Sequence, residues 1–183
     1  MFEISLVRGC FGGLLARVSL VVAVLAGPIH SGPVLGQTLP ERTGPTMLTV
    51  SGLDPNAHPG GAVAFDLAML QALPTTTIAT KSIWTDGLHR FTGVPLAALA
   101  SYLHLKDANL RMFALNDYSV DMPLSETQPD APVLAYQMDG ALMPVRDKGP
   151  IWIIYPYDAG VEYRTDIIYS RSVWQLDRIE VLR

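Results

Sequence analysis

Residues 75–96 read TTTIATKSIWTDGLHRFTGVPL, and the structural pattern changes along this one segment. Its first ten residues, 75–84, are rich in threonine and isoleucine, which predicts a β-strand. The sequence FTGV at 91–94 predicts a bend, and Pro95 stands where proline commonly occupies the first turn of a helix. The segment therefore predicts a strand, a turn and the start of a helix.

The same reasoning extends along the chain and predicts its fold class. The helix that starts at the end of this segment is predicted to cover residues 95–105, where Leu96, Leu99 and Leu103 share one face. A second helix is predicted over residues 62–73, which end before a proline. Strands are predicted at 47–52, 109–116, 133–138, 150–156 and, as one strand or two, 172–182. Two short helices among seven or eight strands predict an α+β domain with mixed β-sheets.

Residues 1–36 have the pattern of a secretory signal peptide. Two arginines precede an apolar run at residues 18–26, and Val34 and Gly36 suit a cleavage site before Gln37. An uncleaved membrane anchor is the alternative, but an arginine shortens the run and a bilayer takes about 20 apolar residues to span.

The signal also predicts the compartment in which the protein works. Arg8 and Arg17 are not adjacent, so the segment does not match the twin-arginine signal that exports folded proteins. We therefore expect residues 37–183 to form a single domain that reaches the periplasm unfolded and has no transmembrane segment after cleavage.

Charge and cysteine content restrict the partners and the chemistry of this domain. The sequence has 13 basic and 17 acidic side chains, a formal net charge of −4; without residues 1–36 there are 11 and 16. A nucleic-acid surface needs clustered Lys and Arg, so nucleic acid is not an expected partner. Cys10 is the single cysteine and leaves with the signal, which predicts no disulfide, thiolate metal ligand or cysteine nucleophile.

Motifs for common catalytic and nucleotide sites do not occur in the sequence. It contains no Gly-x-Ser-x-Gly elbow, P-loop or dinucleotide fingerprint. His58, His89 and His104 are far apart and form no HExxH motif, so a metal site is not expected. Asp117 precedes Tyr118 in NDYSVD, where its carboxylate could accept protons or cap a turn.

Two tryptophans are candidates for ligand contact. Trp152 lies in PIWIIYPY, where both strand faces are apolar, so a core position is open for it. Trp174 has the polar neighbours Arg171, Ser172 and Gln175, and its ring suits stacking on a flat heterocycle or the rim of the core.

The order of segments from residue 65 to the end resembles the molybdopterin-binding domain of the sulfite oxidase family. Four pieces carry the resemblance: FTGVPLAALA, ALNDYSVDMP, LAYQMDGALMPVRDKGPIWIIYP and SVWQLDRIEV. They follow the family's order and cover about 120 residues, which together implies that family's fold.

The chain departs from the family at the metal and at the pyrophosphate contacts. The family binds molybdenum through a cysteine that follows the strand corresponding to TTTIAT, but TKSIWTDG stands there. Hydroxyls of Thr80 or Ser82 are poor substitutes for a soft thiolate ligand. The family's contacts to the cofactor's pyrophosphate are basic, with a lysine where Trp174 stands. The resemblance therefore implies no covalently bound or metal-held cofactor and no catalytic residues.

A short, secreted, cysteine-less domain of this kind resembles periplasmic pterin-binding signalling proteins. The resemblance implies a non-catalytic module that binds a free pterin and acts with an inner-membrane enzyme controlling cyclic di-GMP. A pterin should need an aromatic platform, for which we expect Trp174, and a carboxylate facing its amino-pyrimidine edge. The expected ligand-binding residues are Trp174, Asp117, Tyr118, Arg171, Trp152 and, as the second carboxylate, Asp86.

Two other functions are weighed against this one. A molybdopterin-dependent oxidoreductase would need a metal ligand other than cysteine. A structural or scaffolding domain would have a filled pocket, and the apolar sequence PIWIIYPY is compatible with that.

Overall fold

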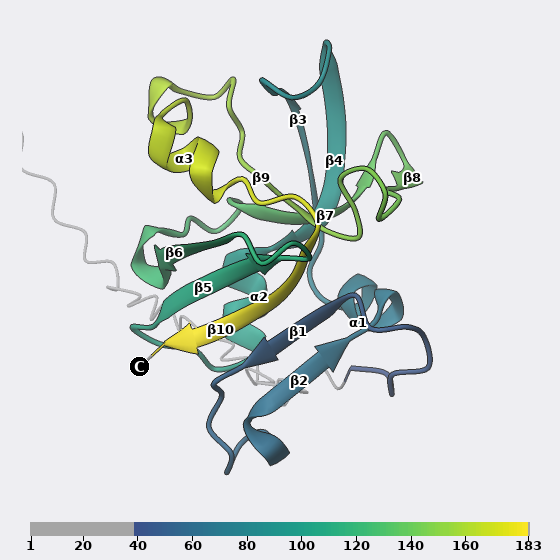
Figure 1. Cartoon of the computed structure of the whole chain (residues 1–183), viewed down its shortest axis with the longest axis vertical. Coiled ribbons are helices and arrows are strands. Elements are labelled where there is room, and N and C mark those ends of the chain that lie inside the picture. The colour runs from purple at the N-terminus through teal and green to yellow at the C-terminus, as the bar shows by residue number, and fades with distance from the viewer. Residues whose placement is uncertain (1–38, 183) are drawn as a thin grey trace, which may run out of the picture. The chain divides into compact units, whose positions relative to one another are not determined.

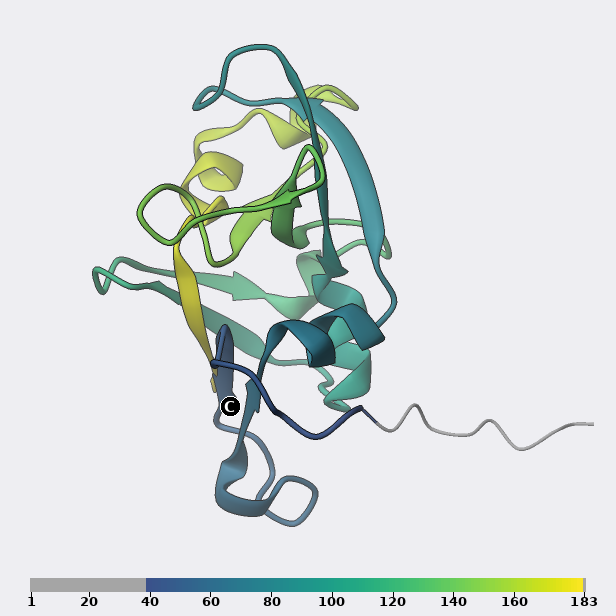
Figure 2. The same cartoon turned by 90° about the vertical axis from the view of Figure 1, so that its right-hand side faces the viewer.

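The computed structural model describes residues 39–182. The predicted signal peptide of residues 1–36, Cys10 and the cleavage position before Gln37 lie outside the described residues. Two five-stranded sheets and three short α-helices make up the described domain, so the α+β prediction with mixed sheets is confirmed. Figures 1 and 2 show that the β3–β4 loop and α3 lie at one end of it, away from the end of β10.

The first sheet joins both ends of the described chain. Its parallel pair, β1 with β10, places Thr49 opposite Arg178, and its other neighbours are antiparallel. In order across the sheet, its strands are β2 (Ala62–Phe65), β1 (Leu48–Ser51), β10 (Leu176–Leu182), β5 (Asn109–Ala114) and β6 (Ser119–Pro123).

The second sheet is antiparallel throughout. Its strands are β3 (Thr76–Lys81), β4 (Leu88–Pro95), β7 (Val133–Met138) and β8 (Ala141–Leu142), with β9 (Trp152–Ile154) also paired to β7. The sequence prediction for 133–138 matches β7 to the residue, and its first four residues are buried, as suits a strand in the interior of the sheet.

Three α-helices and three 3₁₀ turns complete the domain. Asp66 caps the first helix, because its carboxylate accepts a hydrogen bond from the Met69 backbone N–H at 2.9 Å. The helices are α1 (Leu67–Ala72), α2 (Leu96–Tyr102) and α3 (Asp166–Arg171), and the turns are η1 (Pro59–Gly61), η2 (Leu124–Glu126) and η3 (Val161–Tyr163).

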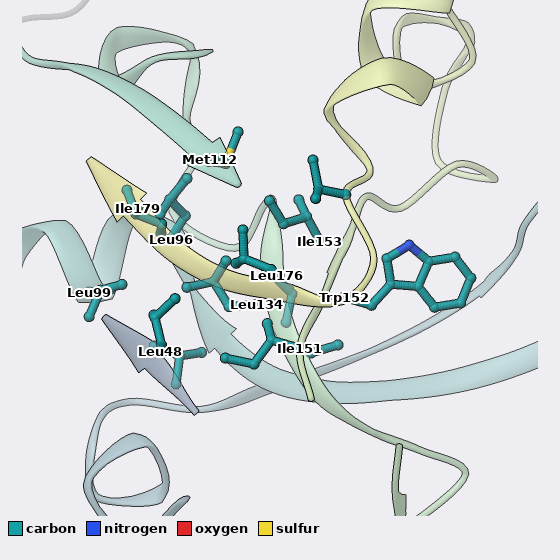
Figure 3. Close-up of a cluster of buried hydrophobic side chains, with 14 of the residues drawn as sticks. Leu48, Leu96, Leu99, Met112, Leu134, Ile151, Trp152, Ile153, Leu176 and Ile179 are labelled. Carbon is teal, nitrogen blue, oxygen red and sulfur yellow. The ribbon is translucent and has the colours of Figure 1, made fainter. Parts of the chain in front are cut away.

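The core fills the space between the sheets and α2. Leu96 and Leu99 point from α2 into this cluster, as the predicted helical stripe required. Trp152 is 0 % exposed and lies at one end of the cluster, with Leu48 and Leu99 toward the other end (Figure 3). The core therefore extends from α2 to the end of the domain where the tryptophans gather.

Residues 91–94 do not form the predicted bend. They continue β4, and the pairing with β7 shifts register between Thr92 and Gly93, which marks a β-bulge. A Cβ at Gly93 would collide with the backbone carbonyl of Leu134. The glycine therefore serves close approach of two strands and does not interrupt the first.

Two other segments differ from their predicted structure. Residues 62–65 form β2, and the helix begins only after the cap Asp66, so the predicted helix over 62–73 was too long. The predicted strand at 172–182 begins at Leu176, and a helix, α3, precedes it. The sequence TDIIYSR did hold a cap signal, because Thr165 accepts a hydrogen bond from the Ile168 N–H.

Candidate functional site

A pocket of about 300 Å³ lies where four separate segments meet. The β3–β4 loop, the β5–β6 turn, α3 and the chain that follows α3 form its walls. Aromatic rings make up four of the nine lining residues, which are Trp84, Ala114, Asn116, Tyr118, Tyr169, Ser170, Ser172, Val173 and Trp174. A volume of this size is at the lower end of the range for small-molecule sites.

Trp84 is the ring around which the other aromatic walls pack. It makes edge-on contacts with four rings at centroid distances of 5.7–6.2 Å: Trp152, Tyr157, Tyr169 and Trp174. The loop around it is fixed by Ser82, whose Oγ accepts from the Trp84 N–H at 3.2 Å and bonds Thr85 Oγ1 at 2.7 Å. Edge-on pairs of this kind stabilise beyond the area they bury.

Trp174 is held by its neighbour Gln175 and by a lysine. Gln175 has a φ of +52° and donates from Nε2 to the Val145 carbonyl at 2.7 Å. The Lys148 ammonium lies 4.1 Å from the centroid of the Trp174 ring, within the range of a cation–π contact. Trp174 remains 37 % exposed, so part of its ring is open while one face is covered by Lys148.

Tyr118 connects the β5–β6 turn to α3 across the pocket. Its hydroxyl donates to the Ser170 carbonyl at 2.9 Å, and the side chain is 47 % exposed. Its backbone N–H donates to Asn116 Oδ1 at 3.2 Å, which fixes the turn. The Tyr118 side chain is therefore fixed at both ends and joins the β5–β6 turn to α3.

The polar groups behind the inner wall of the pocket have hydrogen-bond partners within the protein. The Tyr157 hydroxyl donates to Ser172 Oγ at 2.7 Å, and Ser172 Oγ donates to the Ile168 carbonyl at 2.8 Å. Burial raises the pKa of Tyr157 to about 12, so this hydroxyl keeps its proton at neutral pH. Neither group is free to act as a base or a nucleophile.

Trp174 and Tyr118 are the two predicted site residues that line the pocket. Trp152 lies in the core instead, behind the wall: its Nε1–H donates to the Ser172 carbonyl at 3.1 Å, and its ring packs edge-on against Trp84. The apolar character of both faces of its strand accounts for this burial.

The three charged residues predicted for the site do not line the pocket. Asp117 is 82 % exposed and pairs with Arg178 on β10. Arg171 forms an ion pair with Glu126. Asp86 is exposed in the β3–β4 loop, where its backbone carbonyl accepts from His89. Each is therefore separated from the pocket by its place in the fold or by a partner of opposite charge.

Trp84, Asn116 and Tyr169 line the pocket although the sequence reasoning did not select them. Trp84 stands at the end of the predicted strand 75–84, but β3 ends at Lys81 and Trp84 lies in the loop that follows, where its position depends on tertiary contacts. Tyr169 lies on α3, whose cap residue Thr165 was the available signal.

The residues where the family's cysteine would stand do not fit a molybdenum ligand. Thr80 is buried, and its hydroxyl donates to the Lys81 carbonyl and accepts from the Asp158 N–H, both at 3.3 Å. Ser82 is engaged in the turn around Trp84. Among residues 39–182, no group of three His, Cys, Asp or Glu side chains is placed to hold a metal ion.

No protein-family model matches the sequence, and no curated protein matches it. Within residues 39–182, no helix is both long and apolar enough to cross a membrane.

Proposed function

We propose that this domain is a non-catalytic binding module that takes a free pterin, or a closely related flat heterocycle, in the aromatic pocket. The observation that carries the proposal is the wall of four aromatic residues: Trp84, Tyr118, Tyr169 and Trp174. Flat heterocycles bind well between such rings, because stacking contributes about 1–3 kcal/mol per base in comparable sites.

The chemistry of the walls favours binding over catalysis. The nine lining residues include no His, Asp, Glu, Cys or Lys, the side chains that most often transfer protons or attack substrates. Ser172, a hydroxyl in the wall, has both its donor and an acceptor position used by Ile168 and Tyr157. A ligand in this pocket would contact aromatic rings and amide groups, which can bind the ligand and fix its orientation.

The signalling role rests on the resemblance to periplasmic pterin-binding proteins. By that resemblance the module would report its ligand to an inner-membrane enzyme that controls cyclic di-GMP. Its export by the signal at residues 1–36 would place it in the compartment where such a partner is reached.

A structural domain with a filled pocket is the second candidate. The observation in its favour is the packing of Trp84 against Trp152 at 5.9 Å, which fills space beside the pocket with protein. The remaining volume of about 300 Å³ next to the same ring favours a ligand instead. A molybdopterin-dependent oxidoreductase is not favoured, because the hydroxyls of Thr80 and Ser82 are engaged within the protein.

The test uses protein purified from a host that exports it. The protein is extracted and examined for pterin fluorescence, and free pterins are then titrated against wild type and Trp174→Ala. Loss of one stacking face should weaken binding at least about fivefold. Tyr102→Ala is the matched control, because Tyr102 contacts Phe65 and lies outside the pocket.

Two results would contradict the proposal. Wild type that binds no pterin would favour the structural domain. Unchanged affinity in Trp174→Ala, with Tyr102→Ala also unchanged, would place any pterin site elsewhere on the protein.

A further inference from the structure

The polar groups of the pocket wall that make no hydrogen bond to protein among the described residues include three N–H donors and the Tyr169 hydroxyl, which can donate or accept. Asn116 Oδ1 accepts from the Tyr118 N–H, and because an N–H needs an acceptor, the free end of this amide is its NH₂ group. Within residues 39–182, neither that NH₂ nor the indole N–H groups of Trp84 and Trp174 donate a hydrogen bond to protein. A bound ligand would meet these donors first.

Acceptors in the same wall are largely engaged. The carbonyls of Ser170, Ser172 and Val173 accept from Tyr118, Trp152 and Ile153, respectively. No carboxylate is among the nine lining residues. A ligand that offers mainly N–H groups would therefore find few acceptors, and a donor buried without an acceptor loses affinity.

One cation lies directly against the wall. The Lys148 ammonium lies 4.1 Å from the Trp174 ring centroid, and no ion pair joins it to another side chain in the described part of the chain. A positive charge beside the pocket favours oxygen atoms and negative charge on the ligand. The carboxylate expected at Asp117 is instead paired with Arg178, outside the pocket.

We infer that the pocket binds a flat heterocycle through hydrogen-bond acceptors along one edge of the ring. The NH₂ group of Asn116 is the donor that determines specificity. The inference rests on the proposed function and makes the ligand class more specific. The expected ligand is a ring rich in carbonyl oxygens, and the pocket does not recognise an exocyclic amino group. Stacking on the aromatic walls would supply affinity, and the donors would set orientation.

Two probe rings separate this inference from recognition by a carboxylate. Lumazine has the ring system of pterin with a carbonyl oxygen in place of the amino group and an N–H on the adjacent ring nitrogen, so it offers one more carbonyl acceptor and one fewer N–H. Isothermal titration of the whole exported protein should show lumazine binding more tightly than pterin, by about tenfold, because one donor–acceptor mismatch is removed. Recognition by Asp117 would give the opposite order.

The variant that tests the residue itself is Asn116→Asp. Aspartate keeps the oxygen that accepts from the Tyr118 N–H, so the turn is preserved, and it replaces the free donor by an acceptor. Lumazine affinity should fall by about tenfold or more. Asn109→Asp is the control, because it adds the same charge at the exposed far end of β5, outside the pocket.

The possible outcomes separate the inference from the proposed function. The inference is overturned, and the proposed function stands, in three cases: pterin binds as tightly as lumazine or more tightly; Asn116→Asp matches Asn109→Asp; or Asp117→Asn alone abolishes binding. Absence of binding by both rings to folded wild type would overturn both. Thermal unfolding of each variant checks that the domain is folded.

Discussion

Two of the hollows in the described part of this domain have similar volumes and different kinds of wall. The aromatic pocket has a volume of about 300 Å³ and is lined by rings and small polar groups. A second hollow, of about 400 Å³, has titratable groups of both signs in its wall, namely Asp54, His58, His104, Lys106 and Asp107. Volume alone would rank the second hollow at least equal to the first as a ligand site.

Wall chemistry separates the two hollows. In the aromatic pocket, Trp84 and Trp174 are held by ring contacts and by a cation, and part of the Trp174 ring stays exposed. In the second hollow, His58 Nε2 is buried with no partner among the described residues. The unpartnered donors of the aromatic pocket belong to side chains that are at least partly exposed, so a ligand can reach them, whereas the second hollow carries the cost of a buried, unpartnered nitrogen.

The largest expected effect concerns the ring behind the aromatic pocket. Trp152→Ala should lower the free energy of unfolding by about 3–5 kcal/mol, because it removes a fully buried ring and its hydrogen bond to the Ser172 carbonyl. Urea unfolding measures this. If Trp152→Ala lowered the free energy of unfolding as little as Trp174→Ala does, Trp152 would be a residue of the pocket wall and not part of the core.

A smaller effect is expected for the ring at the centre of the wall. Trp84→Ala should lower the free energy of unfolding by about 2 kcal/mol, because the ring is partly exposed but loses four edge-on contacts. It should also abolish pterin binding in fluorescence titration. Retained binding with this loss of stability would show that the four rings support the fold without forming the site.

The loop that carries Trp84 should respond to pH through His89. Asp139 Oδ2 lies 2.6 Å from Nδ1 and the Asp86 carbonyl lies 2.8 Å from Nε2, so both ring nitrogens must donate and the ring is protonated. The hydrogen bond to Asp139 raises the pKa of His89 above its ordinary 6.5. Hydrogen bonds from the Arg90 N–H and His89 lower the pKa of Asp139 below 3.8.

These directions fix the pH window. His89 stabilises fully below about pH 6.5 and loses that contribution as pH rises through its raised pKa; Asp139 loses its own as pH falls through its lowered pKa. The melting temperature should fall by about 2–4 °C above neutrality, and His89→Gln should remove that dependence. Equal pH profiles for the two proteins would contradict the assignment of a protonated ring.

The smallest effect concerns the second hollow alone. His104 follows α2 in the left-handed conformation, which favours glycine, so His104→Gly should raise the free energy of unfolding by about 0.5–1 kcal/mol. Ligand binding at the aromatic pocket should not change. Destabilisation by this substitution would show that the His104 side chain contributes contacts that outweigh its backbone conformation.

Local patterns predicted the strands and helices where one physical effect dominates. The run 133–138 was predicted to the residue, because it is mostly apolar and is bounded by Pro132 before it and by the turn at Asp139 and Gly140 after it. The bend predicted at 91–94 failed because Gly93 serves contact with Leu134, a residue distant in sequence. The short helix α3 was missed, since one turn and a half gives too little periodicity to detect.

The site was predicted in part for related reasons. Trp174 was selected because a large ring among polar neighbours stands out in a sequence. Tyr118 was selected because it lies beside Asp117 in ALNDYSVDMP, one of the segments that carry the resemblance. The pairing of Asp117 with Arg178 depends on a turn and a strand that meet only in the folded protein, so the sequence could not show that this carboxylate is occupied. The cation–π contact between Lys148 and Trp174 is hidden for the same reason.

The parallel pairing of β1 with β10 has a consequence for how the protein is made. Because the last strand inserts between β1 and β5, the first sheet cannot be completed until the C-terminal residues are available. Contacts between distant parts of a chain also slow folding. A chain that is released N-terminus first therefore cannot complete this sheet early. A truncation that removes β10 (Leu176–Leu182) would leave β1 and β5 with open edges prone to aggregation.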